Sequence, residues 1–155
     1  MDESALRELR DAMGPRPCAF ETAMLAGACA CSLAARRNIA EREAVTCASP
    51  PERERCAALC ALLRQNSSFA LKLTHSGAPL SHAKQMRVQC GGLQGVQRLL
   101  TPAATPEQRE PPSLADVRGL VEAAQEKFGG LPNLPYSAIV QSVVAYQGRR
   151  QRART

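Results

Sequence analysis

The clearest hydrophobic pattern in the chain lies between residues 49 and 65. Apolar side chains recur there three or four residues apart, which is the spacing of one buried face of an α-helix. Ser49 and Glu52 fit the capping box that begins many helices, and two prolines between them suit a first helical turn. The pattern therefore predicts a helix after Ser49 whose buried stripe is formed by Cys56, Leu59, Cys60 and Leu63.

Two further helices are predicted near the C-terminus. Ser113 and Asp116 together form the start of the first, and it ends at Gly129–Gly130, because glycine commonly follows the last helical residue. The segment "GGLPNLP" joins it to a second amphipathic run, and together they predict a helical hairpin. The inward-facing residues are expected to be Leu114, Val117, Val121, Ala124 and Phe128 in the first helix, and Ile139, Val140, Val143 and Val144 in the second.

The patterns elsewhere are weaker. Residues 3–13 predict a short helix, and the alanine-rich stretch 20–38 predicts another. Gly27 and the alternation of Cys29 with Cys31 leave a break open as the alternative, since residues two apart do not share a helix face. A further helix is expected after Ser81, with glycines interrupting it soon after Cys90, and residues 69–73 fit a short extended run.

Composition supports a small helical fold. The chain has 155 residues, of which 45% are hydrophobic and only 3% aromatic, so its core must be built largely from alanine, leucine, valine and cysteine. Small side chains favour close helix packing over a sheet. We therefore predict an all-α protein made of a cysteine-rich helical site domain (1–100), a proline-rich linker (101–112), a helical hairpin (113–148) and a basic tail (149–155).

Cysteine content raises the question of redox compartment. The first residues, "MDESALRELRDAMG", lack the pattern of a secretory signal, and no apolar run reaches membrane-spanning length. A cytoplasmic location is therefore expected, where disulfides are rare. The chain has seven cysteines, an odd number. Metal ligation, redox chemistry and core packing are the interpretations that fit best.

The net charge of +6 is concentrated at one end. Without the four arginines of "GRRQRART" it falls to +2, and the remaining charges of both signs are interleaved. No aromatic stacking platform accompanies the arginines. A solvated basic tail is thus favoured over a nucleic-acid site, and a protein partner, such as a redox partner or a larger complex, is the expected interaction.

Several cysteines stand where the predicted elements begin, break or end. Cys31 lies at the potential helix break, Cys47 just before the Ser49 cap, and Cys90 before two glycines. Cys56 is near the positively polarised start of its helix, where a thiolate is favoured. Such positions allow thiolates to turn toward one point. We therefore predict a metal site made of Cys31, Cys47, Cys56 and Cys90, with Cys29 as the alternative to Cys31, Cys60 as the alternative to Cys56, and Cys18 outside the site.

Dispersed thiolate ligands in a helical frame favour an iron–sulfur cluster, of the 4Fe–4S type, over zinc. The expected function is then electron transfer, an accessory subunit or a redox sensor. The alternative is a zinc-stabilised interaction or adaptor module. Zinc is the second choice because structural zinc usually binds paired C-x2–4-C cysteines, whereas these ligands are dispersed along the chain. A metal-free core remains a third interpretation. His75 and His82 have no motif around them, and no catalytic motif is found, so enzymatic activity is not expected.

Overall fold

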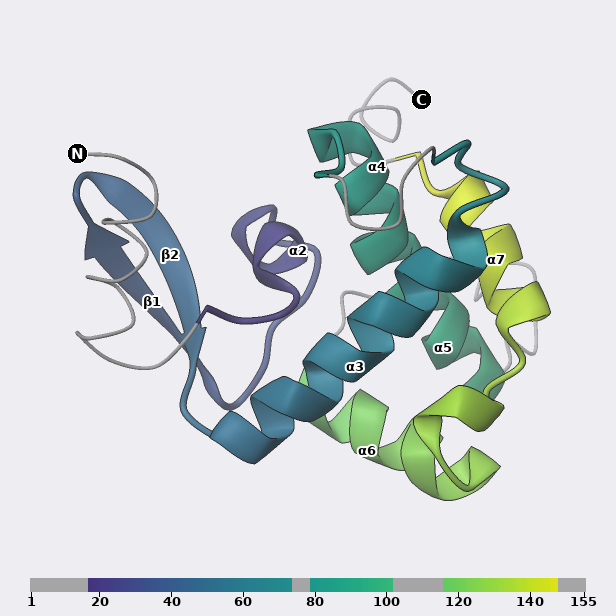
Figure 1. The fold of residues 1–155 in the computed structure, drawn as a ribbon. Coiled ribbons are helices and arrows are strands. Elements are labelled where there is room, and N and C mark those ends of the chain that lie inside the picture. The colour runs from purple at the N-terminus through teal and green to yellow at the C-terminus, as the bar shows by residue number, and fades with distance from the viewer. Residues whose placement is uncertain (1–16, 74–78, 102–115, 148–155) are drawn as a thin grey trace.

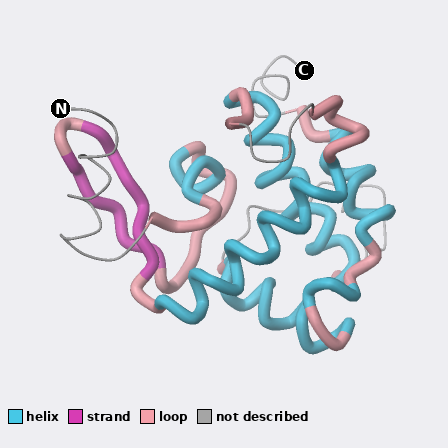
Figure 2. Tube along the Cα trace, viewed as in Figure 1, coloured by secondary structure: helices cyan, strands magenta, loops and turns pink. Residues whose placement is uncertain are grey.

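The computed structural model describes residues 17–73, 79–101 and 116–147, and the predicted helix 3–13, most of the predicted linker and the basic tail lie outside these ranges. The described chain is mostly helical, with one two-stranded antiparallel sheet at one end of the molecule (Figure 1, Figure 2). In chain order the elements are α2 (Glu21–Leu25), β1 (Ala34–Ile39), β2 (Arg42–Cys47), α3 (Pro50–Ser67), α4 (His82–Met86), the π-helix η1 (Arg87–Gly91), α5 (Gly92–Leu100), α6 (Val117–Phe128), the 3-10 helix η3 (Leu131–Asn133) and α7 (Tyr136–Ala145).

The β-hairpin corrects the all-α prediction. The predicted helix over residues 20–38 is confirmed only for the short α2, and the break at Gly27, which has φ +76°, is real. From Ala34 the chain is extended and pairs with β2 in a register that places Ile39 opposite Arg42. Ala40 and Glu41 form the turn, both with positive φ, as a two-residue hairpin turn of type I′ requires. Neither residue is the glycine or asparagine that normally signals such a turn, so local sequence patterns do not predict the hairpin.

Helix α3 begins as predicted. The Ser49 hydroxyl accepts a hydrogen bond from the backbone N–H of Glu52 at 3.4 Å, and prolines occupy the first turn. Its buried positions are Cys56, Leu59, Leu63 and Ser67, which confirms most of the predicted stripe, although Cys60 is only half-buried.

Helices α4, η1 and α5 form one continuous helical run. Ser81 caps it by accepting a hydrogen bond from the N–H of Lys84 at 3.3 Å, as predicted. The glycines after Cys90 do not interrupt the run, which corrects the prediction. Their lack of a side chain instead allows neighbouring helices to pack closely against them. A Cβ on Gly91 would lie 2.7 Å from Cα of Val143, and one on Gly92 would lie 2.7 Å from Cδ1 of Leu63. The predicted extended run at 69–73 is a series of turns instead.

Helix α6 ends and α7 lies where the sequence predicts, whereas the predicted start at Ser113 and the predicted inward-facing Leu114 lie outside the described residues. Gly129 takes the left-handed conformation, with φ +76°, directly after α6. Among the residues expected to face inward, Val117, Val121, Ala124, Ile139 and Val143 are buried, whereas Val144 is 46% exposed.

A single buried cluster contains residues from both sides of the predicted linker. Helix α3 crosses the helical half of the molecule and packs against α6, α7 and η1 (Figure 1). No helix within the described ranges is both long and apolar enough to cross a membrane. The largest fully buried side chains are Phe20, Leu59, Leu63, Leu93 and Ile139.

Candidate four-thiol metal site

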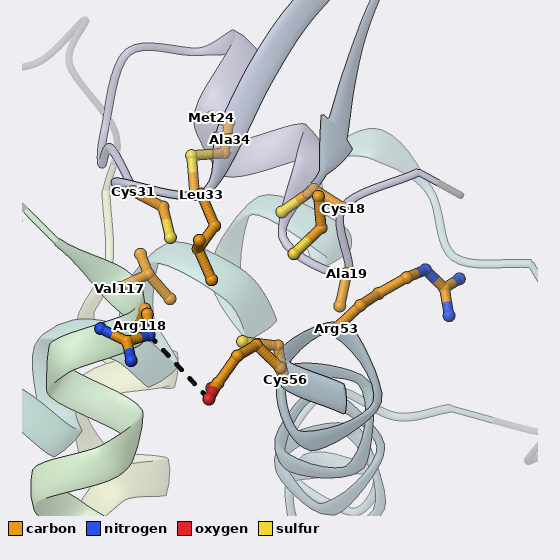
Figure 3. Close-up of a pocket in the computed structure, with 12 residues that line it drawn as sticks. Cys18, Ala19, Met24, Cys31, Leu33, Ala34, Arg53, Cys56, Val117 and Arg118 are labelled. Carbon is orange, nitrogen blue, oxygen red and sulfur yellow. Dashed lines mark ion pairs between the residues drawn. The ribbon is translucent and has the colours of Figure 1, made fainter. Parts of the chain in front are cut away.

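Four cysteines line one pocket between the hairpin, the first turns of α3 and the start of α6. They are Cys18, Cys31, Cys47 and Cys56. In Figure 3 the labelled thiols of Cys18, Cys31 and Cys56 point into this pocket from different segments of the chain. Three of these four residues belong to the predicted ligand set, and Cys18 takes the place that the sequence assigned to Cys90. Leu33, Met24 and Val117 form part of the apolar wall.

Cys18 is held by backbone contacts with β2. Its N–H donates to the carbonyl of Val45 at 2.8 Å, and its sulfur accepts a hydrogen bond from the N–H of Phe20 at 3.4 Å. The Arg53 guanidinium in α3 donates from Nε to the carbonyl of Pro17 at 2.7 Å. These contacts hold the segment before α2 against both the hairpin and α3. Cys18 therefore reaches the pocket although it is far in sequence from the other three cysteines.

Cys31 stands in the loop that precedes β1, and this loop is tied to α6. The Asp116 carboxylate accepts hydrogen bonds from the N–H and the hydroxyl of Ser32, at 3.1 and 3.3 Å. The N–H of Val117 donates to the carbonyl of Ala30 at 2.9 Å. The start of α6 therefore fixes the position of Cys31, which is half-buried.

Cys47 and Cys56 enter the pocket from regular structure. Cys47 is the last residue of β2, and its thiol donates to the carbonyl of Ser49 at 3.4 Å. Cys56 lies in the second turn of α3 with 9% of its surface exposed. Both positions follow from the Ser49 cap, because that cap sets where the strand ends and the helix begins.

The four thiols lie close enough to influence one another's ionisation. The pKa of Cys56 is raised to about 12, chiefly by burial and in smaller part by the neighbouring Cys18, Cys31 and Cys47. The pKa of Cys18 is also raised, first by burial and partly by Cys47 and Cys31. Clustered, desolvated thiols disfavour their own thiolate forms, and a bound cation would reverse this preference.

Charged side chains border the pocket on one side. Glu52, Arg53 and Arg118 contribute to its lining, and Figure 3 shows the ion pair that joins Glu52 to Arg118. Their facing atoms, Oε1 of Glu52 and Nε of Arg118, are 3.9 Å apart. The guanidinium of Arg55 is closer, at 2.9 Å from the same oxygen.

Cys90 is not among the residues of this pocket. It lies in η1 with 3% of its surface exposed, and burial raises its pKa while a hydrogen bond with Tyr146 lowers it. The glycines that follow it bring η1 against α7 and α3 rather than against the pocket. Cys29 is also buried in the core, and the pKa of half-buried Cys60 is raised to about 11 by burial.

The sequence contained one signal for Cys18. It follows Pro17 and precedes a short helix, much as Cys47 precedes the Ser49 cap, so the reasoning that selected Cys47 applied to it as well. All seven cysteines lie in the described ranges and are free thiols. Nevertheless, no group of three or more His, Cys, Asp or Glu side chains in these ranges is gathered tightly enough to form a ready-made ion site. A bound ion would have to draw the four sulfurs closer together.

Comparison of the chain with protein-family models, curated proteins and solved structures finds no match. The functional inference therefore depends on the geometry of this pocket.

Proposed function

We propose that this chain is a small metal-binding protein whose site is formed by Cys18, Cys31, Cys47 and Cys56. The observation that carries the proposal is the convergence of four thiols, from four separate segments, on one pocket. Four thiolates are a sufficient ligand set for zinc or for an iron–sulfur cluster.

Core packing alone is a weaker explanation for three of these four residues. Cys18, Cys31 and Cys47 are only half-buried, and they occupy loops or a strand end rather than an apolar helix stripe. Cysteine that serves as a core residue is usually fully buried. That description fits Cys29 and Cys90, which are buried and do not line the pocket.

Within this proposal we favour a single zinc ion over the 4Fe–4S cluster that the sequence suggested. The space enclosed by the pocket is about that of one water molecule, and the side chains of Leu33 and Met24 occupy its wall. Small rearrangements would gather four sulfurs around one ion, whereas a cluster of eight atoms would require the wall to move outward. When bound, zinc would supply a tetrahedral crosslink among the four thiolates.

The proposed role of the metal is structural. The pocket joins the hairpin to α3 and to the start of α6, so a bound ion would crosslink segments that are far apart in the chain. A zinc-stabilised interaction module, acting in the cytoplasm with a protein partner, accounts for this arrangement. Electron transfer or redox sensing would follow instead if the centre were an iron–sulfur cluster, and nucleic-acid binding remains a minor alternative that concerns the basic tail.

Metal analysis of anaerobically purified protein tests the proposal. We expect about one zinc ion per chain, and its loss in each of four single variants: Cys18→Ser, Cys31→Ser, Cys47→Ser and Cys56→Ser. Cys60→Ser and Cys90→Ser are the matched controls and should retain the metal, because neither residue lines the pocket.

Three other results would change the assignment. Brown protein containing iron and sulfide would replace zinc with the iron–sulfur cluster. Metal loss on Cys90→Ser together with retention on Cys18→Ser would restore the ligand set inferred from sequence. Folded wild-type protein that binds neither zinc nor iron would reject a metal site.

A further inference from the structure

Glu52 has a buried carboxylate oxygen that no group in the described chain satisfies. The side chain is 16% exposed, and its Oε1 atom contacts the guanidinium of Arg55 at 2.9 Å. The other oxygen, Oε2, is buried without a hydrogen-bond partner in the described ranges. Leaving a charged oxygen buried and unpaired is costly, so its position calls for an explanation.

Helix capping does not provide that explanation. In a complete capping box the Glu52 side chain would reach back to the N–H of Ser49. Here only half of the box is formed: Ser49 accepts from the Glu52 N–H, and the Glu52 side chain turns to Arg55 instead. Glu52 contributes to the lining of the same pocket as the four thiols.

The spacing along α3 also relates Glu52 to the thiols. Glu52 and Cys56 are four residues apart, so they lie on the same face of the helix. Carboxylate oxygen is an established zinc ligand alongside thiolate sulfur. Arg55 and Arg118 compensate the carboxylate charge at Oε1, so what a bound ion would supply is a partner for the buried Oε2 atom.

We propose that Glu52 is a metal ligand, with Oε2 as the oxygen donor of the four-thiol site. This inference rests on the proposed metal-binding function. The pocket then offers four sulfurs and one oxygen, and the carboxylate competes with a thiolate for one position on the ion. Such a mixed donor set suits a divalent ion that accepts both oxygen and sulfur, such as Zn²⁺ or Co²⁺, rather than Cu(I), which favours sulfur alone.

Titration of the full-length protein with Co²⁺ tests this role, because the visible spectrum of bound Co²⁺ depends on its ligands. Glu52→Gln removes the anionic donor with little change in shape. Glu54→Gln is the matched control, since Glu54 is an exposed residue of the same helical turn. Arg55→Gln removes the partner of Oε1 and leaves Oε2 in place. Zn²⁺ competition then gives the relative affinities.

We expect Glu52→Gln to weaken Co²⁺ binding by about tenfold or more, the range found when groups around a metal site are removed, and to change the spectrum of bound Co²⁺. Glu54→Gln and Arg55→Gln should leave affinity and spectrum close to wild type. If Glu52→Gln does not fold, Glu52→Asp keeps the carboxylate on a shorter side chain and should still shift the spectrum.

Two outcomes would overturn the proposal for Glu52. One is an unchanged spectrum with Glu52→Gln or, if that variant does not fold, with Glu52→Asp. The other is an equal loss of affinity with Arg55→Gln, which would assign the effect to the ion pair. Failure of the wild-type protein to bind Co²⁺ and Zn²⁺ would instead reject the metal site itself, so the two proposals fail in different ways.

Discussion

The two ends of this molecule are stabilised in different ways. At the helical end, large side chains such as Leu59, Leu63 and Ile139 are fully buried, and glycines allow helices to approach closely. At the pocket end, the hairpin and the loops before α2 and β1 meet through hydrogen bonds and small residues, and residues 35–38 of β1 are exposed. Both ends share one buried cluster, but the pocket end also depends on specific hydrogen bonds around the four thiols.

This difference explains why the cysteines fall into two groups. Cys90 is buried in the core, where it packs as a small apolar side chain would, and it does not line the pocket. Cys18, Cys31 and Cys47 are only half-buried, and they lie in loops or at a strand end. A metal crosslink would add most stability at that end. Four changes, ordered here by the expected loss of stability, should therefore affect the two ends differently.

Leu63→Ala should have the largest effect. Leu63 is 1% exposed and contacts the α5 backbone at Gly92, so truncation leaves a cavity and should lower the free energy of unfolding by about 2–5 kcal/mol. Urea unfolding with and without a chelator measures the free energy of unfolding, and the decrease caused by Leu63→Ala should be the same in both conditions. Val144→Ala, at an exposed position of α7, is the control. A loss that depended on metal would contradict the separation of the two ends.

Metal removal should have the next largest effect. At a free zinc concentration 100–1000 times the Kd, binding stabilises the folded state by about 3–4 kcal/mol, and chelation should remove that contribution. Hydrogen exchange should locate the change. The amide of Cys18, which donates to Val45, should lose protection before the amides of α5. Uniform loss of protection across both ends would show that the metal supports the entire core.

Gly91→Ala should be smaller and metal-independent. The added Cβ would meet the Val143 Cα at 2.7 Å and the Ser142 carbonyl oxygen at 2.8 Å, and backbone cannot move aside as a flexible side chain can. We expect a loss of about 1–3 kcal/mol in a thermal melt, with metal content unchanged. Gly119→Ala, whose Cβ would lie 3.4 Å from Asp116, should instead be neutral or stabilising by about 0.5–1 kcal/mol. Similar losses in both variants would refute the packing argument.

Asp116 should give the smallest effect, and one that depends on pH. The N–H of Ser32 is the main cause that holds the pKa of this carboxyl below its ordinary value of 3.8. A carboxyl with a depressed folded-state pKa stabilises the protein above its unfolded pKa and loses that contribution as pH falls through the folded value.

Asp116→Ala should therefore reduce stability at neutral pH, by less than about 1 kcal/mol because solvent screens the interaction. The difference from wild type should shrink below about pH 4. Stability measured by urea unfolding from pH 7 to pH 2.5 provides the comparison. A difference that stayed constant with pH would assign the effect to helix capping rather than to the charge.

Local sequence determined the parts of this protein that local chemistry can specify. Ser49 with its prolines begins α3, Ser81 begins the run into α5, and Gly129 ends α6, because caps and left-handed glycines act on the nearest turn. The periodicity of apolar residues likewise located the buried face of α3. The same reasoning identified three of the four cysteines that line the pocket, since each stands beside such a boundary.

Tertiary structure decided that residues 34–47 form a hairpin and that Cys18 is the fourth cysteine of the pocket. Neither glycine nor asparagine occupies the turn at Ala40 and Glu41, and the segment becomes a hairpin because β2 packs against α2 and pairs with Pro17. That pairing carries Cys18 into the pocket. Close packing of Gly91 and Gly92 against α7 and α3 takes Cys90 into the core. Contacts between residues far apart in the chain leave no periodic trace in the sequence, so the local signal at Pro17 could not show which pocket Cys18 would line, and nothing local showed that Cys90 would lie in the core.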